Sequence, residues 1–252
     1  MITLLMIAIG AIGGFFSGLL GIGGAIIIVP MLLGIPQLFG MNQIPPHTVT
    51  GLSMVQVFLA SLSGAVAHYR RGSFPFKLLI PMALAFSLAA FAGALLSAAF
   101  SGDVVLSIFS LILLASGVVL WKPRTAPVNS PTPRPHSLIA VGIAIGLLSG
   151  IAGIGGGLLI VPALTILAGI PLSKAVGYSL GVVCIGSLAG TVGKTVTGQI
   201  DWAMAAPLGI ASIAFAQLGV IAHRKTPEKI IRAILLIVIL LSFFGIWHRI
   251  LT

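Results

Sequence analysis

Acidic residues are almost absent from this sequence. Only 3 of its 252 residues are Asp or Glu, against 13 Lys or Arg, and the charged fraction is 6% while the hydrophobic fraction is 58%. So few charged side chains cannot cover the surface of a water-soluble domain of this size. Mean hydropathy is +1.23, and apolar runs of 18 or more residues recur along the chain. The composition therefore predicts an all-α polytopic membrane protein, with the lipid bilayer as its first partner.

Other absences narrow the function. The single cysteine, Cys184, excludes an internal disulfide and a cysteine metal cluster. The chain has no P-loop motif, so ATP would need a separate subunit, and it has no HExxH motif or paired Asp. We therefore expect no enzyme activity and no metal. The N-terminus lacks a basic region before its first apolar run, which argues against a conventional cleaved signal peptide. The net charge of +10 sits in short loops, where it orients helices, and we expect no nucleic-acid partner.

The three acidic residues also limit the substrate. Asp103, Asp201 and Glu228 all fall at the ends of predicted helices. No carboxylate is thus expected at membrane depth as a sodium ligand or proton relay. This favours an anionic substrate over a cationic one. The sequence does not identify a coupling ion; a proton and other ions both stay open.

A glycine-rich block occurs twice. Residues 14–32 read GFFSGLLGIGGAIIIVPML, and residues 146–164 read GLLSGIAGIGGGLLIVPAL, with an offset of 132. From residue 51 onward, glycines, serines, prolines and a tryptophan repeat at an offset of 126. A glycine cluster inside an apolar run breaks a membrane helix. Such breaks at matching places in two halves are typical of a transporter binding site.

The repeat divides the chain into two transmembrane halves, 1–121 and 137–252, joined by a Pro-rich linker, 122–136. Each half is predicted to contain a glycine-broken helical hairpin followed by three transmembrane helices. The broken segments are 3–39 and 138–170; whether they re-enter or fully span is left open. The expected long helices are 48–69, 77–100, 104–121, 174–196, 202–222 and 229–248.

Loop charges predict that the two halves are inverted. In the first half the basic loop follows the first long helix, and in the second half it follows the second long helix. These loops hold Arg70, Arg71 and Lys77 in the first case and Arg224, Lys225, Lys229 and Arg232 in the second. Under the positive-inside rule, the linker is then cytoplasmic and both termini lie outside, with Lys194 and Arg249 as the outer basic residues.

The glycine breaks are the predicted substrate site. Glycine admits a ligand close to the backbone, and the half-helix after each break presents unpaired N–H groups that suit an oxyanion. The predicted substrate-binding residues are Gly21, Gly23, Gly24, Gly153, Gly155, Gly156 and Gly157, with Ser17, Ser149, Ser53, Ser179 and Gln56 as hydrogen-bonding side chains. A tight turn between two ordinary spans is the alternative reading of each break. Gln217 is a further intramembrane amide that could contact a ligand.

Two other features have packing explanations. Glycines at four-residue spacing are typical of close helix contact. They are Gly10, Gly14 and Gly18 in the first half and Gly142, Gly146 and Gly150 in the second. Lys194 lies at a predicted membrane boundary, where a lysine either attracts anions at an outer vestibule or extends to the interface.

The twin blocks at Gly14–Pro30 and Gly146–Pro162 resemble the sulfite exporter TauE/SafE family of membrane permeases. The small-residue patches at Gly51–Ser53 and Gly177–Ser179 resemble those that follow each block in that family. The resemblance covers essentially the whole chain. It implies transport of a sulfur-containing oxyanion, such as sulfite or a sulfonate, without a bound cofactor. One departure is Ala25, where the second copy has Gly157.

These observations predict a secondary transporter that moves a small sulfur-containing oxyanion across the cell membrane by alternating access. The alternatives are an anion-selective channel and a carrier of a non-sulfur organic anion. A bacterial or archaeal plasma membrane is the expected location. The particular anion, the direction of transport and homo-oligomerisation are left open.

Overall fold

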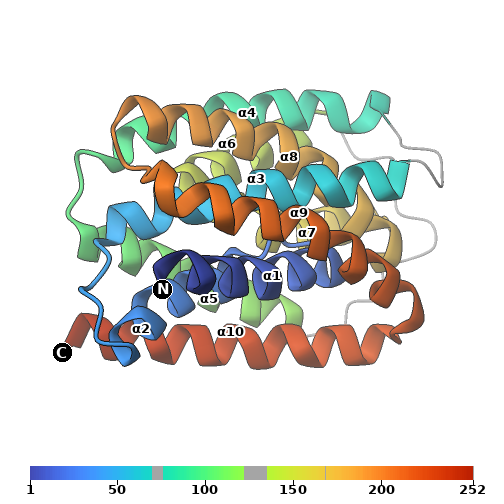
Figure 1. The fold of residues 1–252 in the computed structure, drawn as a ribbon. Coiled ribbons are helices and arrows are strands. Elements are labelled where there is room, and N and C mark those ends of the chain that lie inside the picture. Colours follow the sequence, from blue (N-terminus) through green and yellow to red (C-terminus); the bar gives the residue numbers. More distant parts are fainter. Residues whose placement is uncertain (70–75, 122–134, 168, 252) are drawn as a thin grey trace.

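The computed structural model describes all residues except 70–75, 122–134, 168 and 252 (Figure 1). Every regular element in the described part is a helix. The helices are α1 (Ile2–Leu20), α2 (Ala25–Leu38), α3 (Pro46–Tyr69), α4 (Phe76–Ser97), α5 (Gly102–Trp121), α6 (Pro135–Ala152), α7 (Gly157–Leu167), α8 (Leu172–Val196), α9 (Trp202–Lys225) and α10 (Glu228–Leu251). The predicted all-α fold is therefore confirmed.

The six long helices expected from hydropathy are all present, with small differences at their ends. The largest differences are three residues: α4 ends at Ser97 where residue 100 was predicted, and α9 and α10 end at Lys225 and Leu251 where 222 and 248 were predicted. Helix α6 begins at Pro135, so the last two residues of the predicted linker belong to a helix. Proline suits the first helical position because its missing N–H would have no partner there. The rest of the predicted linker, 122–134, lies outside the described residues.

Seven of the helices in the described part of the chain are long and apolar enough to cross a membrane: α1, α3, α4, α5, α8, α9 and α10. Of these, α3 and α8 are the most buried, and they pack against each other at the centre of the bundle (Figure 1). The outer helices instead expose large apolar side chains, such as Leu88, Ile210 and Leu241 at 75%, 68% and 69%. An apolar outer surface suits lipid contact, and the chain is a multi-pass membrane protein.

The two halves contact each other through two equivalent pairs of helices. Helix α1 of the first half packs along α9 of the second, and α6 of the second packs along α4 of the first. The glycine ladders lie at these contacts: Gly10, Gly14 and Gly18 meet the backbone of Leu208, Ser212 and Ala216, and Gly142, Gly146 and Gly150 meet that of Met82, Phe86 and Ala90. The two sets of partners are separated by the repeat offset of 126. The predicted packing role of these six glycines is confirmed, because a Cβ would overlap the facing backbone.

The first broken segment folds as a helical hairpin. Ile2 at the start of α1, Pro36 near the end of α2 and Gly40 just after α2 line one cavity, so both open ends lie at the same end of the bundle. The glycine break between the two helices therefore lies inside the molecule. Both chain termini are at this same end (Figure 1).

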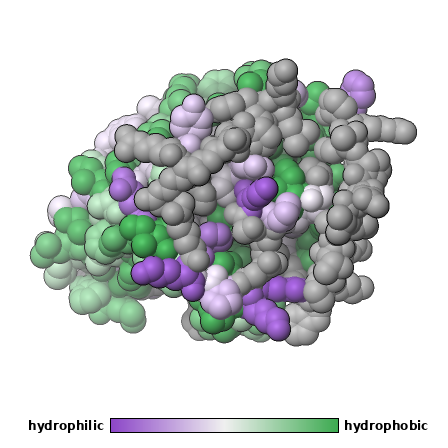
Figure 2. Space-filling model, turned by 90° about the vertical axis from the view of Figure 1, so that its right-hand side faces the viewer, coloured by the Kyte–Doolittle hydropathy of each residue, from purple (hydrophilic) through white to green (hydrophobic). Residues whose placement is uncertain are grey.

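Basic residues gather at the opposite end. It includes the start of α8, the end of α9 and the start of α10, which contribute Lys174, Lys225, Lys229 and Arg232. Figure 2 looks onto this end and shows hydrophilic side chains among the described residues. At the other end, the first turn of α5 contains Asp103, and Asp201 caps α9. The described charges are therefore distributed unequally between the two ends.

Candidate functional site

Each glycine break contains three residues with left-handed backbone. In the first break φ is +70° at Gly21, +87° at Gly23 and +82° at Gly24. The second break repeats the pattern, with φ of +74°, +71° and +77° at Gly153, Gly155 and Gly156. Only glycine adopts these angles without a steric penalty. The glycines are thus required by the chain reversal itself, whatever else they bind.

The two breaks meet at the centre of the bundle. Gly157 lies against the backbone of Ile22, where an added Cβ would come within 2.7 Å. Val57 on α3 contacts both breaks, because its side chain faces the Cβ positions of Gly23 and Gly155. The two glycine breaks therefore lie next to each other in the fold. The close approach to Ile22 also explains why the second copy has Gly157 where the first has Ala25.

One serine ties each break to the other half of the chain. The Ser53 hydroxyl donates to the carbonyl oxygen of Gly153 at 2.9 Å, and the Ser179 hydroxyl donates to that of Gly21 at 2.7 Å. Both serines are completely buried. Their hydroxyl protons have backbone acceptors here, so their clearest role is to position the breaks.

The other three predicted polar residues are buried without a partner among the described residues. They are Ser17 in the last turn of α1, Ser149 in the last turn of α6 and Gln56 on α3, exposed by 0%, 2% and 0%. Neither serine hydroxyl has a hydrogen bond, and neither does Nε2 or Oε1 of Gln56. Gln56 Nε2 lies 3.0 Å from the Cβ position of Gly24, at the first break. Each unpaired buried group costs about 1–3 kcal/mol, which requires an explanation.

The helices that leave the breaks add backbone donors. Helix α2 starts at Ala25, directly after Gly24, and has no side-chain cap; α7 starts at Gly157. The first N–H groups of a helix have no acceptor within it, and its N-terminal end is electropositive. Amide, hydroxyl and backbone N–H donors near two such ends form an arrangement that suits an oxyanion.

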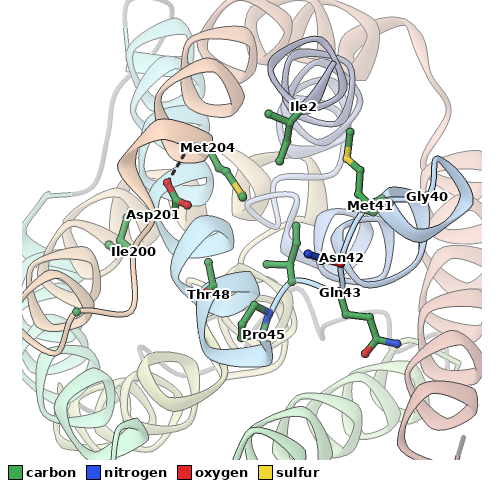
Figure 3. Close-up of a pocket in the computed structure, with 13 residues that line it drawn as sticks. Ile2, Gly40, Met41, Asn42, Gln43, Pro45, Thr48, Ile200, Asp201 and Met204 are labelled. Atoms are coloured by element: carbon green, nitrogen blue, oxygen red, sulfur yellow. Dashed lines mark hydrogen bonds between the residues drawn. The ribbon is translucent and has the colours of Figure 1, made fainter.

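The centre is closed in this structure. Ser149, Ile154, Gly156 and Leu158 contribute to a small apolar cavity too narrow for a water molecule. A larger cavity of about 750 Å³ lies at the end of the bundle that holds the chain termini. Figure 3 shows side chains around it from the start of α1, the loop after α2, the start of α3 and the start of α9. The open space is therefore separated from the glycine breaks.

Lys194 is placed differently from either sequence expectation. It is completely buried, so its side chain neither reaches the interface nor lies in an open vestibule. Its ammonium donates to side chains of Thr50, Ser97 and Gln199. These three partners lie on α3, α4 and the α8–α9 loop, and sequence reasoning missed all of them. Gln217, by contrast, is exposed on α9 and is not part of this site.

Comparisons with known proteins agree with the sequence motifs. The family model for sulfite exporter TauE/SafE matches residues 6–246. A probable membrane transporter protein of Xylella fastidiosa (strain 9a5c) is 32% identical, over 97% of this chain and 95% of its own length. The probable membrane transporter protein YunE of Bacillus subtilis (strain 168) is 27% identical, over 94% of each chain. A probable membrane transporter protein of Methanocaldococcus jannaschii is 28% identical, over 92% of this chain and 90% of its own length. No solved structure matches.

The family match covers almost the whole chain, and the relatives align over nearly their full lengths. Seven apolar helices of membrane-spanning length and the doubled glycine breaks fit a transporter of this kind. The chain therefore belongs to the sulfite exporter TauE/SafE family of membrane transporters.

Proposed function

We propose that this transporter carries a small sulfur-containing oxyanion, of the sulfite or sulfonate type, and binds it between the two glycine breaks. The observation that carries the proposal is the set of buried, unpaired polar atoms on Ser17, Ser149 and Gln56. All three residues belong to helices that form or contact the breaks. A bound oxyanion would accept hydrogen bonds from the hydroxyls and the amide, and would remove the cost of leaving them unpaired.

The electrostatics support an anion over a cation. The starts of α2 and α7 present helix N-terminal ends beside the breaks, and such ends favour negative charge. The chain has only three acidic residues, and each belongs to the start of a helix, at Asp103, Asp201 and Glu228. A cation at the breaks would have no carboxylate ligand from these positions.

The transport cycle we propose is alternating access between two inverted halves. The closed centre, with Val57 packed against both breaks, supports a carrier that occludes its site. Helices α1 and α6 each pack against a helix of the other half. These two equivalent contacts are the surfaces on which one half would rock against the other. We further propose that the basic end of the bundle, with Lys174 and Lys225, faces the cytoplasm.

A ligand screen tests the substrate assignment. Purified protein would be heated with sulfite, thiosulfate, ethanesulfonate, sulfate or acetate, and its melting temperature measured. A ligand at 100 times its Kd stabilises the folded state by about 2.7 kcal/mol, which corresponds to a rise of about 5–10 °C for a chain of this size. We expect such a rise with sulfite or the sulfonate. A rise with acetate alone would contradict the sulfur-oxyanion assignment.

A flux measurement tests the mechanism. In proteoliposomes loaded with the stabilising anion, we expect saturable uptake of labelled anion that accelerates through exchange. Flux that stays proportional to concentration and shows no exchange would identify an anion channel instead.

A further inference from the structure

The ammonium of Lys194 lies in a fully buried cage of uncharged oxygen atoms. Lys194 is in the last turn of α8, and none of its surface is exposed. Its Nζ donates to Gln199 Oε1 at 2.7 Å, Ser97 Oγ at 3.0 Å, Thr50 Oγ1 at 3.1 Å and the Ile151 carbonyl oxygen at 3.5 Å. The hydrogen-bonding capacity of the ammonium is thus satisfied, but its charge is not neutralised by any of these groups.

The three acidic residues of the chain lie at the starts of helices. Asp201 accepts hydrogen bonds from the backbone N–H groups of Ala203 and Met204 as the cap of α9. Asp103 is exposed in the first turn of α5. Glu228 begins α10, which starts at the opposite end of the bundle from the end of α8 (Figure 1). An ionisable residue inside a membrane protein is costly and marks a substrate or ion pathway by default. None of the described acceptors around Nζ carries a negative charge, which leaves the site open to an anion from outside the chain.

The cage lies between the open cavity and the second glycine break. On the outer side, Gln199 is flanked by Gly198 and Ile200, which both line the 750 Å³ cavity (Figure 3). On the inner side, the carbonyl and Cβ of Thr50 lie directly against Gly153. An anion passing from the cavity to the break would therefore meet the Lys194 ammonium first.

We propose that Lys194 is an anion-docking and gating residue, whose missing counter-charge is the transported oxyanion; this rests on the proposed function. In the closed state the ammonium joins α8 to α3, α4 and the α8–α9 loop through neutral acceptors. A charged oxyanion forms stronger hydrogen bonds with an ammonium than hydroxyl and amide oxygens do. When the anion arrives, the ammonium bonds to it in place of the neutral acceptors. The contacts that hold the outer end closed are then released.

Replacement of the charge by an apolar side chain of similar length tests the assignment. We expect Lys194→Met to bind sulfite at least tenfold more weakly than wild type. Its melting temperature without ligand should be unchanged or higher, because an uncompensated buried charge is removed. Lys194→Arg, which keeps the charge, should retain more sulfite affinity than Lys194→Met. Lys174→Met is the matched control, since it removes an exposed lysine from the same helix, and it should bind sulfite as wild type does.

The opposite results are equally informative. If Lys194→Met binds sulfite with the wild-type Kd, whether or not its melting temperature falls, Lys194 only stabilises the fold and the proposal is wrong. If that variant does not fold, Thr50→Val removes one neutral acceptor while keeping the side-chain shape. We expect several-fold tighter sulfite binding in Thr50→Val, and unchanged or weaker binding would overturn the proposal. Wild-type protein that binds no oxyanion would instead contradict the proposed function, and the Lys194 assignment with it.

Discussion

The Ser53 hydroxyl on α3 donates a 2.9 Å hydrogen bond to the carbonyl oxygen of Gly153, 100 residues later in the chain. The repeat-related pair, Ser179 and Gly21, forms the same bond in the other direction between the halves. Each half therefore fixes the glycine break of the other. In the proposed alternating-access cycle, movement of one half against the other would have to strain these two bonds or carry them along.

Loss of either hydroxyl should destabilise the protein. We expect Ser53→Ala or Ser179→Ala to lower the free energy of unfolding by about 1–3 kcal/mol, because each leaves a buried carbonyl oxygen without its partner. Thermal melts of the purified variants would measure the effect. Ser116→Ala is the control: its hydroxyl donates to the Ile112 carbonyl within its own helix, so its loss should matter less. Equal melting temperatures for Ser53→Ala and Ser116→Ala would contradict a special role for the cross-half bond.

Substitution within a glycine break should impair folding and transport together. Gly155→Ala places a Cβ at a φ of +71° and against the Val57 side chain. The backbone conformation alone costs about 1–3 kcal/mol for a non-glycine residue. The same change at Gly34, an α2 position with no atom within 4 Å of an added Cβ, should be neutral or stabilising by up to about 1 kcal/mol. Melting temperature and purified yield provide the comparison.

A second substitution separates the two causes in the break. Val57→Ala makes room for the new Cβ but leaves the positive φ unchanged. We therefore expect the double variant Gly155→Ala/Val57→Ala to recover part of the stability lost in Gly155→Ala. No recovery would mean that the backbone angle, and not the contact with Val57, sets the whole cost.

Labelling of repeat-related positions should reveal the proposed inversion. Ala99 and Lys225 are both exposed and are separated by the repeat offset of 126. In a Cys184→Ala background, we expect Ala99→Cys to react with a membrane-impermeant maleimide on intact cells. Lys225→Cys should react only after the membrane is permeabilised. Reaction of both variants from one side would contradict inverted halves, and the reverse pattern would contradict only the proposed orientation.

Local sequence patterns predicted the features that depend on local physics. Apolar length predicted the long helices, and the clustered glycines predicted two breaks that the structure resolves into matching positive φ angles. Four-residue glycine spacing predicted close helix packing, because a close backbone approach requires small residues on one face, and the structure places these contacts at α1–α9 and α4–α6.

Features that depend on distant segments could not be predicted in this way. Lys194 sits near the end of its helix, where a lysine usually extends toward water, yet Thr50 and Ser97 from two other helices enclose it. Val57 is one apolar residue among many, and only the tertiary fold places it against both breaks. Ser53 and Gln56 are one turn apart and equally buried, yet only Ser53 has an acceptor within reach.

Because the Gln56 side chain is buried without a partner, its replacement by an apolar residue should stabilise the protein. Gln56→Leu removes two unpaired buried polar atoms, and we expect it to raise the free energy of unfolding by about 1–3 kcal/mol in the absence of ligand. The same variant should show a smaller rise in melting temperature on adding sulfite, because a donor to the anion is lost. Its repeat counterpart is Val182, so the fold already accommodates an apolar side chain at the equivalent position. A lower melting temperature with an undiminished response to sulfite would mean that Gln56 supports the fold and does not bind the anion.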